Sequence, residues 1–595
     1  MPKSIPGPNP GQDFAEEISA SKTQHIVQIA HQEEAKGVID SASENDASAT
    51  YAAWTNSIVQ NYRELWAMMR PAFRQDRTLR LLTEVVTGLL LTTARRKTLT
   101  SAMIENGLSN SDNSKYYALF RDYLWDPLWI QDAILRECLK FLKPGQRPVL
   151  AMDDTTIPKP YSGDEEFNEY VAWGIDHTGP KWMVQLMRGI RMEHMVFLIP
   201  DWTTHRPWPI SIRFEPVKTR NQAVREAKGI KLEKRKRAKR GVTPPIDVRK
   251  PQPWDAFKER DRRPRKKADN NTDAGPAEAT PKPRGHPKKG SEDSDEAKDP
   301  KVAPLMDSGE LAIHGVWKAM EEAGEAHRGL LLATDGSYCN GRIFHTLPDG
   351  VKIIARARRN CSLFTIPEKP VRNQVYGERL PTPEEFAKDR TVPDTTVDVH
   401  YGGALQTLRI KEMPFPVRWK GTSRLPIRVI VVQAVPYKLR KKRKGYNQRA
   451  YLFTTDLVTP TQELCQAYCD RWSIEDVHRG TKTDAGLGDP QVGTKSTEKV
   501  FTALMAGFSM LSLAAYGAHG PTRTGDYRPR PKWLRNIDER HARENKAMGI
   551  LTAPRRPSTA DILQLFREEW QLFKASEAAE QSEQPMRRAP SKRLA

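Results

Sequence analysis

The sequence has few cysteines and no long apolar run, and both shortages exclude common classes of protein. The five cysteines are scattered through the 595 residues and include no C-x-x-C pair. This predicts reduced thiols, not a disulfide framework or a zinc site. No run of about eighteen or more apolar residues occurs, so we expect no membrane-spanning helix. The opening MPKSIPGPNPGQDFAEE lacks the apolar segment of a secretion signal, which favours a cytoplasmic protein.

Acidic residues are also fewer than basic residues. The chain contains 74 Asp and Glu against 95 Lys and Arg, a formal net charge of +21. A charge of this size favours a polyanionic partner, although it does not by itself separate DNA from RNA or from an acidic membrane surface. At roughly 150 residues per domain, the length predicts about three or four units instead of a single core.

Residues 51–145 predict a helical domain, because apolar residues recur at helical spacing in LLTEVVTGLLLTT and WIQDAILRECLKFL. Between these segments, KTLTSAMIENGLSNSDNSKYYALFRD predicts a helix, a turn at Gly107 and a second helix. This is the layout of a helix-turn-helix, in which Lys115, Tyr116 and Arg121 would be available to contact DNA. An ordinary pair of antiparallel helices without a nucleic-acid role is an equally good interpretation.

From residue 147 the pattern changes to that of a mixed sheet. PVLAMDDTT, GIRMEHMVFLIPD and WPISIRFEP predict strands up to residue 216. Residues 217–305 are rich in Lys, Arg and Pro and poor in core-forming residues, so we expect a disordered basic insertion. It is either a solvated linker or a sequence-independent contact with phosphates.

After the insertion, helical and strand patterns alternate, which indicates an α/β layer. The helix GELAIHGVWKAMEEAG precedes the strand GLLLATDG, and a helix around YCNGRIFHTL precedes the strand VKIIARAR. Residues 359–450 are rich in predicted strands and contain the basic loop KLRKKRKGYNQR. One helix is then expected to begin after TPTQEL and to run to about residue 484, followed by the apolar helix VFTALMAGFSMLSLAAYGA and a last amphipathic helix at 558–575.

Three acidic residues are prominent because of their positions. Asp154 ends the first predicted strand, Asp335 ends the strand LLLATDG, and Glu475 lies within a predicted helix. Aspartates at the carboxyl ends of strands point into the crevice where α/β proteins carry out chemistry. Three converging carboxylates suit Mg²⁺ or Mn²⁺, and two such ions could flank a phosphodiester. For each aspartate alone, a turn or cap role is the alternative.

Asp153 and Asp154 cannot both point toward such a site, because neighbouring residues on a strand face opposite sides of the sheet. We choose Asp154, which directly precedes Thr155 and Thr156.

The stretch YCDRWSIEDVHRGTK carries a second set of polar residues. At about 100° per residue along one helix, Tyr468, Arg471, Glu475 and Lys482 fall within about 60° of one another. A carboxylate flanked by two cations and a phenol suits an anionic, metal-bound ligand, and arginine can bind phosphate with two hydrogen bonds. An exposed helix with ordinary i, i+4 ion pairs is the alternative. His478, somewhat off this face, is interpreted as structural.

AMDDTTIPK, LLLATDGSY and the spacing Tyr468-x2-Arg471-x3-Glu475-x6-Lys482 resemble the bacterial insertion-sequence transposases of the DDE class. The resemblance is to the group with a Y-R-E-K signature and a β-strand insertion domain, and it covers roughly residues 51–520. It implies an RNase H-like fold, dependence on two Mg²⁺ or Mn²⁺ ions, and cut-and-paste DNA transposition in the bacterial nucleoid. This chain departs from the pattern in the basic insertion between its first two aspartates.

Carried over by position, the resemblance implies roles for individual residues. Metal binding would fall to Asp154, Asp335 and Glu475, and contacts with DNA phosphates to Tyr468, Arg471 and Lys482. In relatives, an aromatic residue of the insertion domain stacks on a flipped base, and Trp419 is the candidate here. A tryptophan that simply packs in the domain is the alternative.

The resemblance also organises the chain as an α/β protein with an RNase H-like mixed sheet, an all-β insertion and an all-α N-terminal domain. The expected parts are a mobile tail (1–50), a helical DNA-binding domain (51–145), a first catalytic part (146–358) with the basic insertion (217–305), a β-rich insertion domain (359–450), a second catalytic part (451–520), and a C-terminal connector, helix and tail (521–595).

The expected partners are double-stranded DNA, both as terminal inverted repeats and as target, and a second copy of the chain in a synaptic homodimer. Two other functions remain open from the sequence. The first is an RNase H-like DNA nuclease without strand transfer. The second is a non-catalytic DNA-binding protein derived from a transposase, although a binding module has no need of three converging carboxylates.

Overall fold

The computed structural model describes most of the chain between residues 54 and 583. The described residues are 54–107, 114–159, 169–176, 185–201, 205–227, 303–370, 374–401, 404–422, 425–434, 436–440, 443–446, 448–490, 494–520 and 557–583, with positions 536, 539–540 and 543. The predicted N-terminal tail and residues 228–302 of the predicted basic insertion lie outside them. The first residues of that insertion form helix α8 (Arg220–Ala227), which belongs to a separate compact unit from the residues on either side.

The N-terminal region is helical, as predicted. Ser57 caps the first helix by accepting a hydrogen bond from the backbone N–H of Gln60. Asp126 caps the last helix of the region by accepting from Leu128 and Trp129. The elements are α3 (Ile58–Met68), the 3-10 turn η1 (Arg70–Ala72), α4 (Asp76–Leu91), α5 (Leu99–Glu105), α6 (Ser114–Arg121) and α7 (Pro127–Leu139).

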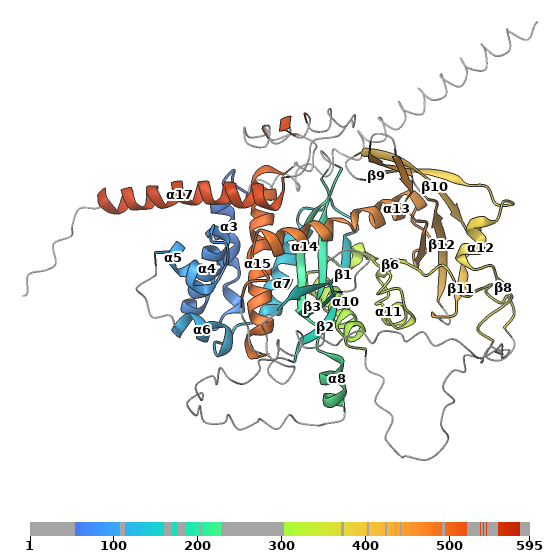
Figure 1. Cartoon of the computed structure of the whole chain (residues 1–595), viewed down its shortest axis with the longest axis horizontal. Coiled ribbons are helices and arrows are strands. Elements are labelled where there is room, and N and C mark those ends of the chain that lie inside the picture. The colour runs from blue at the N-terminus through green and yellow to red at the C-terminus, as the bar shows by residue number, and fades with distance from the viewer. Residues whose placement is uncertain are drawn as a thin grey trace, which may run out of the picture. The chain divides into compact units, whose positions relative to one another are not determined.

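Thirteen of the described strands form one mixed sheet (Figure 1). Its first half is organised around β1 (Val149–Pro158), which is antiparallel to β3 (Gln185–Ile199) and parallel to β5 (Leu330–Thr334). The flanking strands are β2 (Val171–Asp176) and β4 (Trp208–Pro216), both antiparallel to β3, and β6 (Val351–Arg356), parallel to β5. The chain is therefore a mixed α/β protein, which confirms the predicted fold class at this level.

Strands between residues 359 and 450 continue the same sheet. β15 (Ala450–Thr454) is antiparallel to both β6 and β12 (Pro426–Val432), and so joins the two halves. The other elements here are β7 (Leu363–Phe364), β8 (Arg379–Leu380), α12 (Pro383–Lys388), β9 (Thr395–Tyr401), β10 (Ala404–Glu412) and β11 (Val417–Trp419). The segment predicted as a basic loop instead forms a separate two-stranded hairpin, β13 (Pro436–Arg440) and β14 (Arg443–Tyr446).

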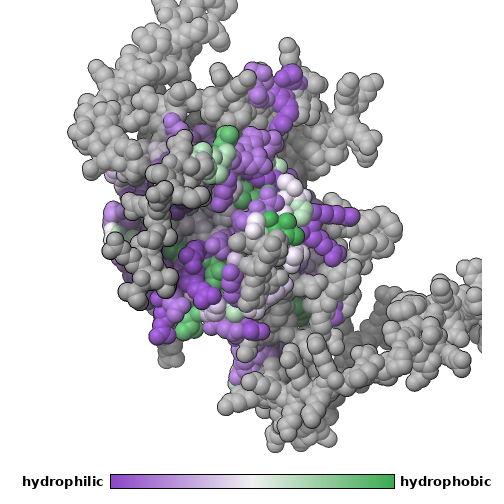
Figure 2. All heavy atoms as spheres, turned by 90° about the vertical axis from the view of Figure 1, so that its left-hand side faces the viewer, coloured by the Kyte–Doolittle hydropathy of each residue, from purple (hydrophilic) through white to green (hydrophobic). Residues whose placement is uncertain are grey.

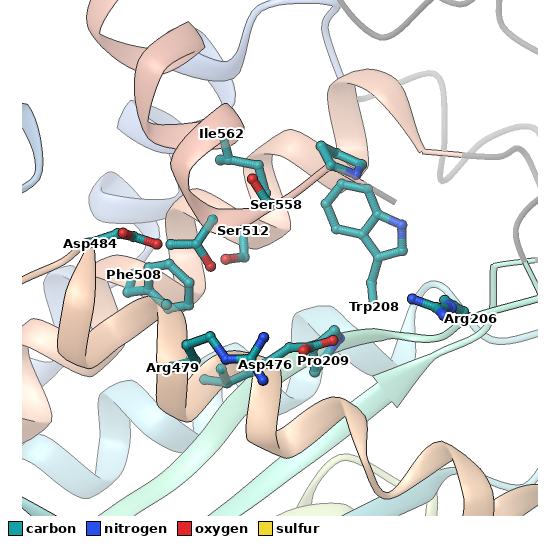
Figure 3. Close-up of a pocket in the computed structure, with 14 residues that line it drawn as sticks. Arg206, Trp208, Pro209, Asp476, Arg479, Asp484, Phe508, Ser512, Ser558 and Ile562 are labelled. Atoms are coloured by element: carbon teal, nitrogen blue, oxygen red, sulfur yellow. The ribbon is translucent and has the colours of Figure 1, made fainter. Parts of the chain in front are cut away.

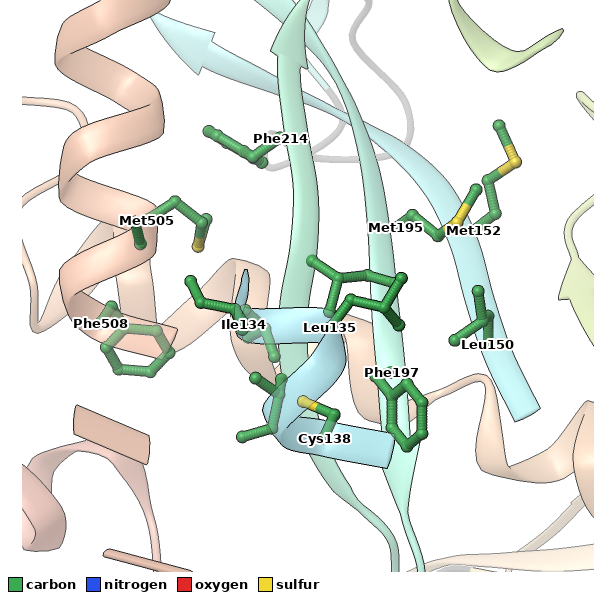
Figure 4. Packing of buried hydrophobic residues seen from close by; sticks show 14 of the residues in the cluster. Ile134, Leu135, Cys138, Leu150, Met152, Met195, Phe197, Phe214, Met505 and Phe508 are labelled. Atoms are coloured by element: carbon green, nitrogen blue, oxygen red, sulfur yellow. The ribbon is translucent and has the colours of Figure 1, made fainter. Parts of the chain in front are cut away.

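One face of the first half of the sheet is covered by α7 and α10 (Pro304–Glu322). In Figure 4, side chains of α7 lie against Leu150 and Met152 of β1 and Met195 and Phe197 of β3. All four strand residues are fully buried or nearly so. The even-numbered residues of β1 at this point therefore face α7.

The opposite face is covered by α13 (Thr461–Asp470) and α14 (Ser473–Thr483). Ala151 of β1 and Val196 of β3 form a separate apolar cluster with Ile474 of α14. Ala333 of β5 belongs to another cluster on this side, together with Leu464 of α13. The odd-numbered residues of β1 and β5 at this point therefore face α13 and α14.

Helix α15 (Thr494–His519) is long and apolar enough to cross a membrane by length and composition alone, over Ser496–His519. Its most apolar window is wholly buried inside the protein, where the helix contacts α3, α4, α7 and β4. It therefore serves as a core helix that joins the N-terminal helices to the sheet. The remaining short elements of the central region are η2 (Ala326–Arg328) and α11 (Gly341–Thr346).

The predicted C-terminal amphipathic helix is present as α17 (Thr559–Glu583), and it completes two N-terminal helices. Glu569 accepts hydrogen bonds from the Ser57 hydroxyl at 3.1 Å and from the Val59 backbone N–H at 3.2 Å, at the start of α3. Arg567 donates to the backbone oxygens of Leu90, Leu91 and Thr92 at the end of α4. Helix ends leave such groups unpaired within the helix, so α17 satisfies them from a distant part of the chain.

We expect Glu569→Ala to lower the free energy of unfolding by about 1–2 kcal/mol, because a partly buried helix start loses its acceptor. Urea unfolding followed by circular dichroism measures this change. Glu568→Ala is the matched control, because Glu568 is exposed and bonds only to Gln564 of its own helix in the described structure. Equal stabilities of the two variants would contradict the capping role.

Candidate active site

The parallel register of β1 and β5 brings two aspartates to the same place. Ala151 pairs with Ala333, so Asp153 of β1 and Asp335, which directly follows β5, come two residues later along neighbouring parallel segments. Side chains on a strand alternate between faces. Because both alanines face α13 and α14, both aspartates point to that face as well. This is the edge where parallel strands present their carboxyl ends.

Asp153 is only 8% exposed, and its environment opposes ionisation. Nη1 of Arg471 donates to its Oδ2 at 3.0 Å, and the Asp154 backbone N–H donates to its Oδ1 at 2.8 Å. Burial first, and then the nearby carboxylates of Asp335 and Glu475, nevertheless raise the pKa of Asp153 to about 7 against the lowering effect of Arg471. Three acids are thus close enough to influence one another's charge.

Asp154, the residue chosen from the sequence, points the other way. It lies on the side of β1 that carries Leu150 and Met152, toward α7. There it accepts hydrogen bonds from Nε and Nη2 of Arg191 at 2.7 and 2.8 Å. The choice of Asp154 is therefore corrected to Asp153. The sequence shows two adjacent aspartates but not which face of the strand carries α14.

The predicted single helix that begins after TPTQEL and runs to about residue 484 is also corrected, because α13 ends at Asp470 and α14 begins at Ser473. Hydrogen bonds here join residues three apart: Trp472 N to Cys469 O at 3.2 Å, Ile474 N to Arg471 O at 3.0 Å, and Glu475 N to Trp472 O at 3.1 Å. No Pro or Gly causes this break. The tighter turn accompanies the burial of the Arg471 side chain beside Asp153.

Tyr468 and Arg471 lie together despite the break. The guanidinium carbon of Arg471 is 5.6 Å from the centroid of the Tyr468 ring. Burial raises the pKa of Tyr468, and Asp335 raises it further. Nε of Arg471 is buried and has no hydrogen-bond partner among the described residues. A buried donor without an acceptor is costly, so this nitrogen is a natural position for an anionic oxygen.

Glu475 and Lys482 complete the predicted set on α14. The side chain of Glu475 is 44% exposed, and its pKa is lowered first by His478 and then by the charges of Arg471 and Lys482. Lys482 donates to Oγ1 of Thr155 on β1, and burial lowers its pKa. The structure thus brings Tyr468, Arg471, Glu475 and Lys482 to one side of the sheet, around Asp153 and Asp335.

In the described part of the chain, no three His, Cys, Asp or Glu side chains form a ready metal-binding group. The donor set at Asp153, Asp335 and Glu475 nevertheless fits a divalent cation in its chemistry. The raised pKa of Asp153 reflects a buried carboxylate beside other carboxylates, and a cation relieves this repulsion. Mg²⁺ and Mn²⁺ both prefer such oxygen ligands.

Trp419 packs within the protein. Its ring is half-buried and lies edge-on to Phe344 and Phe453, with centroids 5.7 and 5.4 Å away. A Cβ added to Gly421 would lie 2.6 Å from the indole, so this turn is built around the ring. These contacts favour the packing interpretation of Trp419 over base stacking.

The predicted DNA-contacting residues of α6 differ in exposure. Tyr116 is 1% exposed and donates to Glu84 at 3.1 Å, so its assignment as a DNA contact is corrected to a core position. Arg121 is exposed but bonded to Asp122, and Lys115 lies over the Tyr116 ring. Figure 2 views the molecule from the side of these helices and shows a mainly hydrophilic face with small, separate hydrophobic spots.

Two further residues were not assigned to the site from the sequence. Trp472, directly after Arg471, is 53% exposed, which is unusual for an indole beside a buried ion pair. His478 is buried behind Glu475 and contacts His194 of β3, with His194 Nδ1 at 2.8 Å from His478 Nε2. The distance between these two histidines along the chain gives no sequence signal of their contact.

A pocket of about 330 Å³ lies on another side of α14 (Figure 3). Asp476, Arg479 and Asp484 line it, together with Phe508 of α15 and Ile562 of α17. None of the three acids of the candidate site lines this pocket.

A comparison with models of protein families and a search of curated proteins found no match to this chain.

The raised pKa of Asp153 predicts a specific pH dependence. The carboxyl keeps its proton to about pH 7 in the folded chain but loses it at about pH 4 when unfolded, so stability is lost as pH rises from about 4 to 7 and levels off above the folded pKa. Asp153→Asn cannot ionise. The free energy of unfolding of this variant minus that of the wild type should therefore increase between about pH 4 and 7, by at most about 1.4 kcal/mol per pH unit, and level off above pH 7.

Urea unfolding in EDTA at several pH values measures this difference. Loss of the contact with Arg471 changes the free energy of unfolding of the variant by a constant amount at every pH. The test therefore depends on how the difference between variant and wild type changes with pH, and not on its absolute size. A difference that stays level, or that falls with pH, would contradict the burial of an ionisable Asp153.

Proposed function

We propose that the chain is a DNA transposase of the DDE type, with Asp153, Asp335 and Glu475 as its metal-binding acids. It would hydrolyse a phosphodiester at each transposon end and then use the freed 3′-OH to attack target DNA. The observation that carries this proposal is the meeting of Asp153 and Asp335 on the sheet face covered by α14, the helix of Glu475. The first acid differs by one position from the sequence-based choice.

The strand arrangement supports the RNase H-like fold that the resemblance implies. β1, β5 and β6 are neighbouring parallel strands, and β3 extends the sheet antiparallel on the other side of β1. Asp153 lies on β1, and Asp335 directly follows β5, the strand parallel to it. The strands of residues 359–450 enter between β6 and α13 in the sequence, where the resemblance expects a β-strand insertion.

The chemistry of the acids fits Mg²⁺ or Mn²⁺. When bound, a pair of such ions activates the attacking oxygen and stabilises the leaving oxygen. Asp153 and Asp335 would hold the ions from the sheet, and Glu475 from α14. Arg471 provides positive charge beside Asp153. The guanidinium therefore balances part of the buried negative charge.

Arg471, Tyr468 and Lys482 would bind the DNA backbone beside the acids. The unpaired Nε of Arg471 offers a donor to a phosphate oxygen, and Lys482 adds a second charge on the same side. Tyr468 limits where Arg471 can turn, because its ring lies under the guanidinium. The net charge of +21 supports a long anionic partner.

A nuclease without strand transfer would use the same acids, so only its products distinguish it. A non-catalytic DNA-binding protein is the weaker alternative. Burying Asp153 beside two other carboxylates lowers the stability of the fold. A protein that only binds DNA does not need this arrangement, whereas a metal-dependent enzyme does.

The acids can be tested with a plasmid that carries the natural flanks of the coding sequence. Asp153→Asn, Asp335→Asn and Glu475→Gln should each reduce Mg²⁺-dependent cleavage at the transposon ends by at least about 1000-fold, because metal charge stabilises the transition state. DNA binding in gel shifts should survive.

Asp154→Asn is the matched control, since Asp154 faces α7 and bonds to Arg191. It should retain most of the cleavage activity. Loss of activity in Asp154→Asn together with normal activity in Asp153→Asn would reverse the assignment. Cleaved ends that never join target DNA would favour the nuclease.

The phosphate contact can be tested with Arg471→Lys, which keeps the charge but removes the unpaired Nε and the forked geometry. We expect the rate of end cleavage to fall about 10–100-fold, in line with about 1.5–3 kcal/mol for a charge-assisted hydrogen bond. Arg479→Lys on the pocket side of α14 serves as the control. A similar rate for both variants would favour a purely structural Arg471.

A further inference from the structure

Three buried polar side chains lie behind Glu475 and reach from α14 across the sheet. Nε2 of His478 is 2.8 Å from Nδ1 of His194 on β3, and Nε2 of His194 is 2.9 Å from the Ser211 hydroxyl on β4. All three are less than 9% exposed. At the other end, Nδ1 of His478 is 3.8 Å from Oε2 of Glu475. That separation is longer than a hydrogen bond, and a small rotation of the half-exposed Glu475 would close it.

A β-bulge places Ser211 in this chain of contacts. β3 and β4 pair His194 with Phe214 and Val196 with Ser211, with a register shift between Met195 and Val196. Two residues of β3 are thus matched by three of β4, so Ser211 faces the same side as His194. In regular pairing its hydroxyl would point toward α7. The bulge therefore directs the hydroxyl of Ser211 toward Nε2 of His194.

The contacts permit one consistent arrangement of protons. Of two ring nitrogens 2.8 Å apart, one donates and the other accepts. If His194 donates from Nδ1, its Nε2 accepts from Ser211, and the proton of His478 is on Nδ1, toward Glu475. The reverse arrangement would present a lone pair of His478 to the carboxylate, which is repulsive. Burial lowers the pKa of both histidines, in keeping with neutral rings.

We propose that His478 is a positioning residue that aims the carboxylate of Glu475, and that His194 and Ser211 fix the tautomer in which it does so. This proposal rests on the proposed function, because it assigns Glu475 to a metal. A buried donor behind a metal-binding carboxylate restricts its rotation and orients its free oxygen. His194 has no other role in the candidate site, and it is fully buried in the middle of the polar chain, where a histidine is costly unless both ring nitrogens are hydrogen-bonded.

The test measures Mn²⁺ binding to the DNA-free, full-length protein by the paramagnetic resonance signal of free Mn²⁺. His478→Phe keeps a ring but removes the donor, and should weaken binding about 10–100-fold. His478→Asn returns an N–H near the position of Nδ1 and should restore most of the affinity. Ser211→Ala should give a smaller loss of several-fold, because His194 is no longer held in one tautomer.

Ser509→Ala is the matched control for Ser211→Ala. Ser509 is a buried serine of α15 whose hydroxyl has no hydrogen-bond partner among the described residues, so Mn²⁺ binding should not change. Circular dichroism establishes that each variant is folded. If His478→Phe does not fold, Ser211→Ala and His478→Asn decide the question. Unchanged affinity in a folded Ser211→Ala, or no advantage of Asn over Phe at position 478, overturns the positioning role.

Glu475→Gln separates this inference from the proposed function. If Glu475→Gln leaves Mn²⁺ binding unchanged, Glu475 is no ligand and the metal site itself is wrong. If Glu475→Gln weakens binding while His478→Phe and Ser211→Ala do not, the site stands and only the positioning role is wrong.

Discussion

The parallel pairing of β1 with β5 is the constraint on which the candidate site depends. It sets Ala151 beside Ala333, and strand alternation then sends Asp153 and Asp335 to the same face. A shift of one residue in either strand would move one aspartate to the face of α7. The apolar residues on both sides of β1 oppose such a shift, because it would place Met152 against α14 and Asp153 in the core.

Charge accounts for the local structure around these aspartates. Asp153 is buried beside other carboxylates, and Arg471 compensates for it from the junction of α13 and α14. Arg471 contacts Asp153 from the point where the helix breaks between α13 and α14, and no Pro or Gly requires this break. The same break leaves Trp472 exposed and lets α14 follow β1, so that Glu475 and Lys482 lie near the strand end. The break is therefore part of the site.

Much of the secondary structure could be predicted from periodicity, but the site could be predicted only to within one residue. The apolar runs of β1 and β5 and the periodicity of the amphipathic helices are visible in the sequence and predict these elements. The choice between Asp153 and Asp154 depends on which face carries α14, and that is a tertiary fact. Tyr116 could have been recognised as buried, because it shares a helix face with Leu119. The contact of His194 with His478 joins distant segments and leaves no sequence signal.

The most direct test of the central claim is the anomalous diffraction signal of Mn²⁺ in a crystal of the protein. We expect a peak within about 2.0–2.4 Å of carboxylate oxygens from both Asp153 and Asp335, as is usual for Mn²⁺ or Mg²⁺ bound to oxygen ligands. A fully occupied peak bound to Asp154 instead of Asp153, or a Mn²⁺ site that includes neither β1 nor β5, would contradict it.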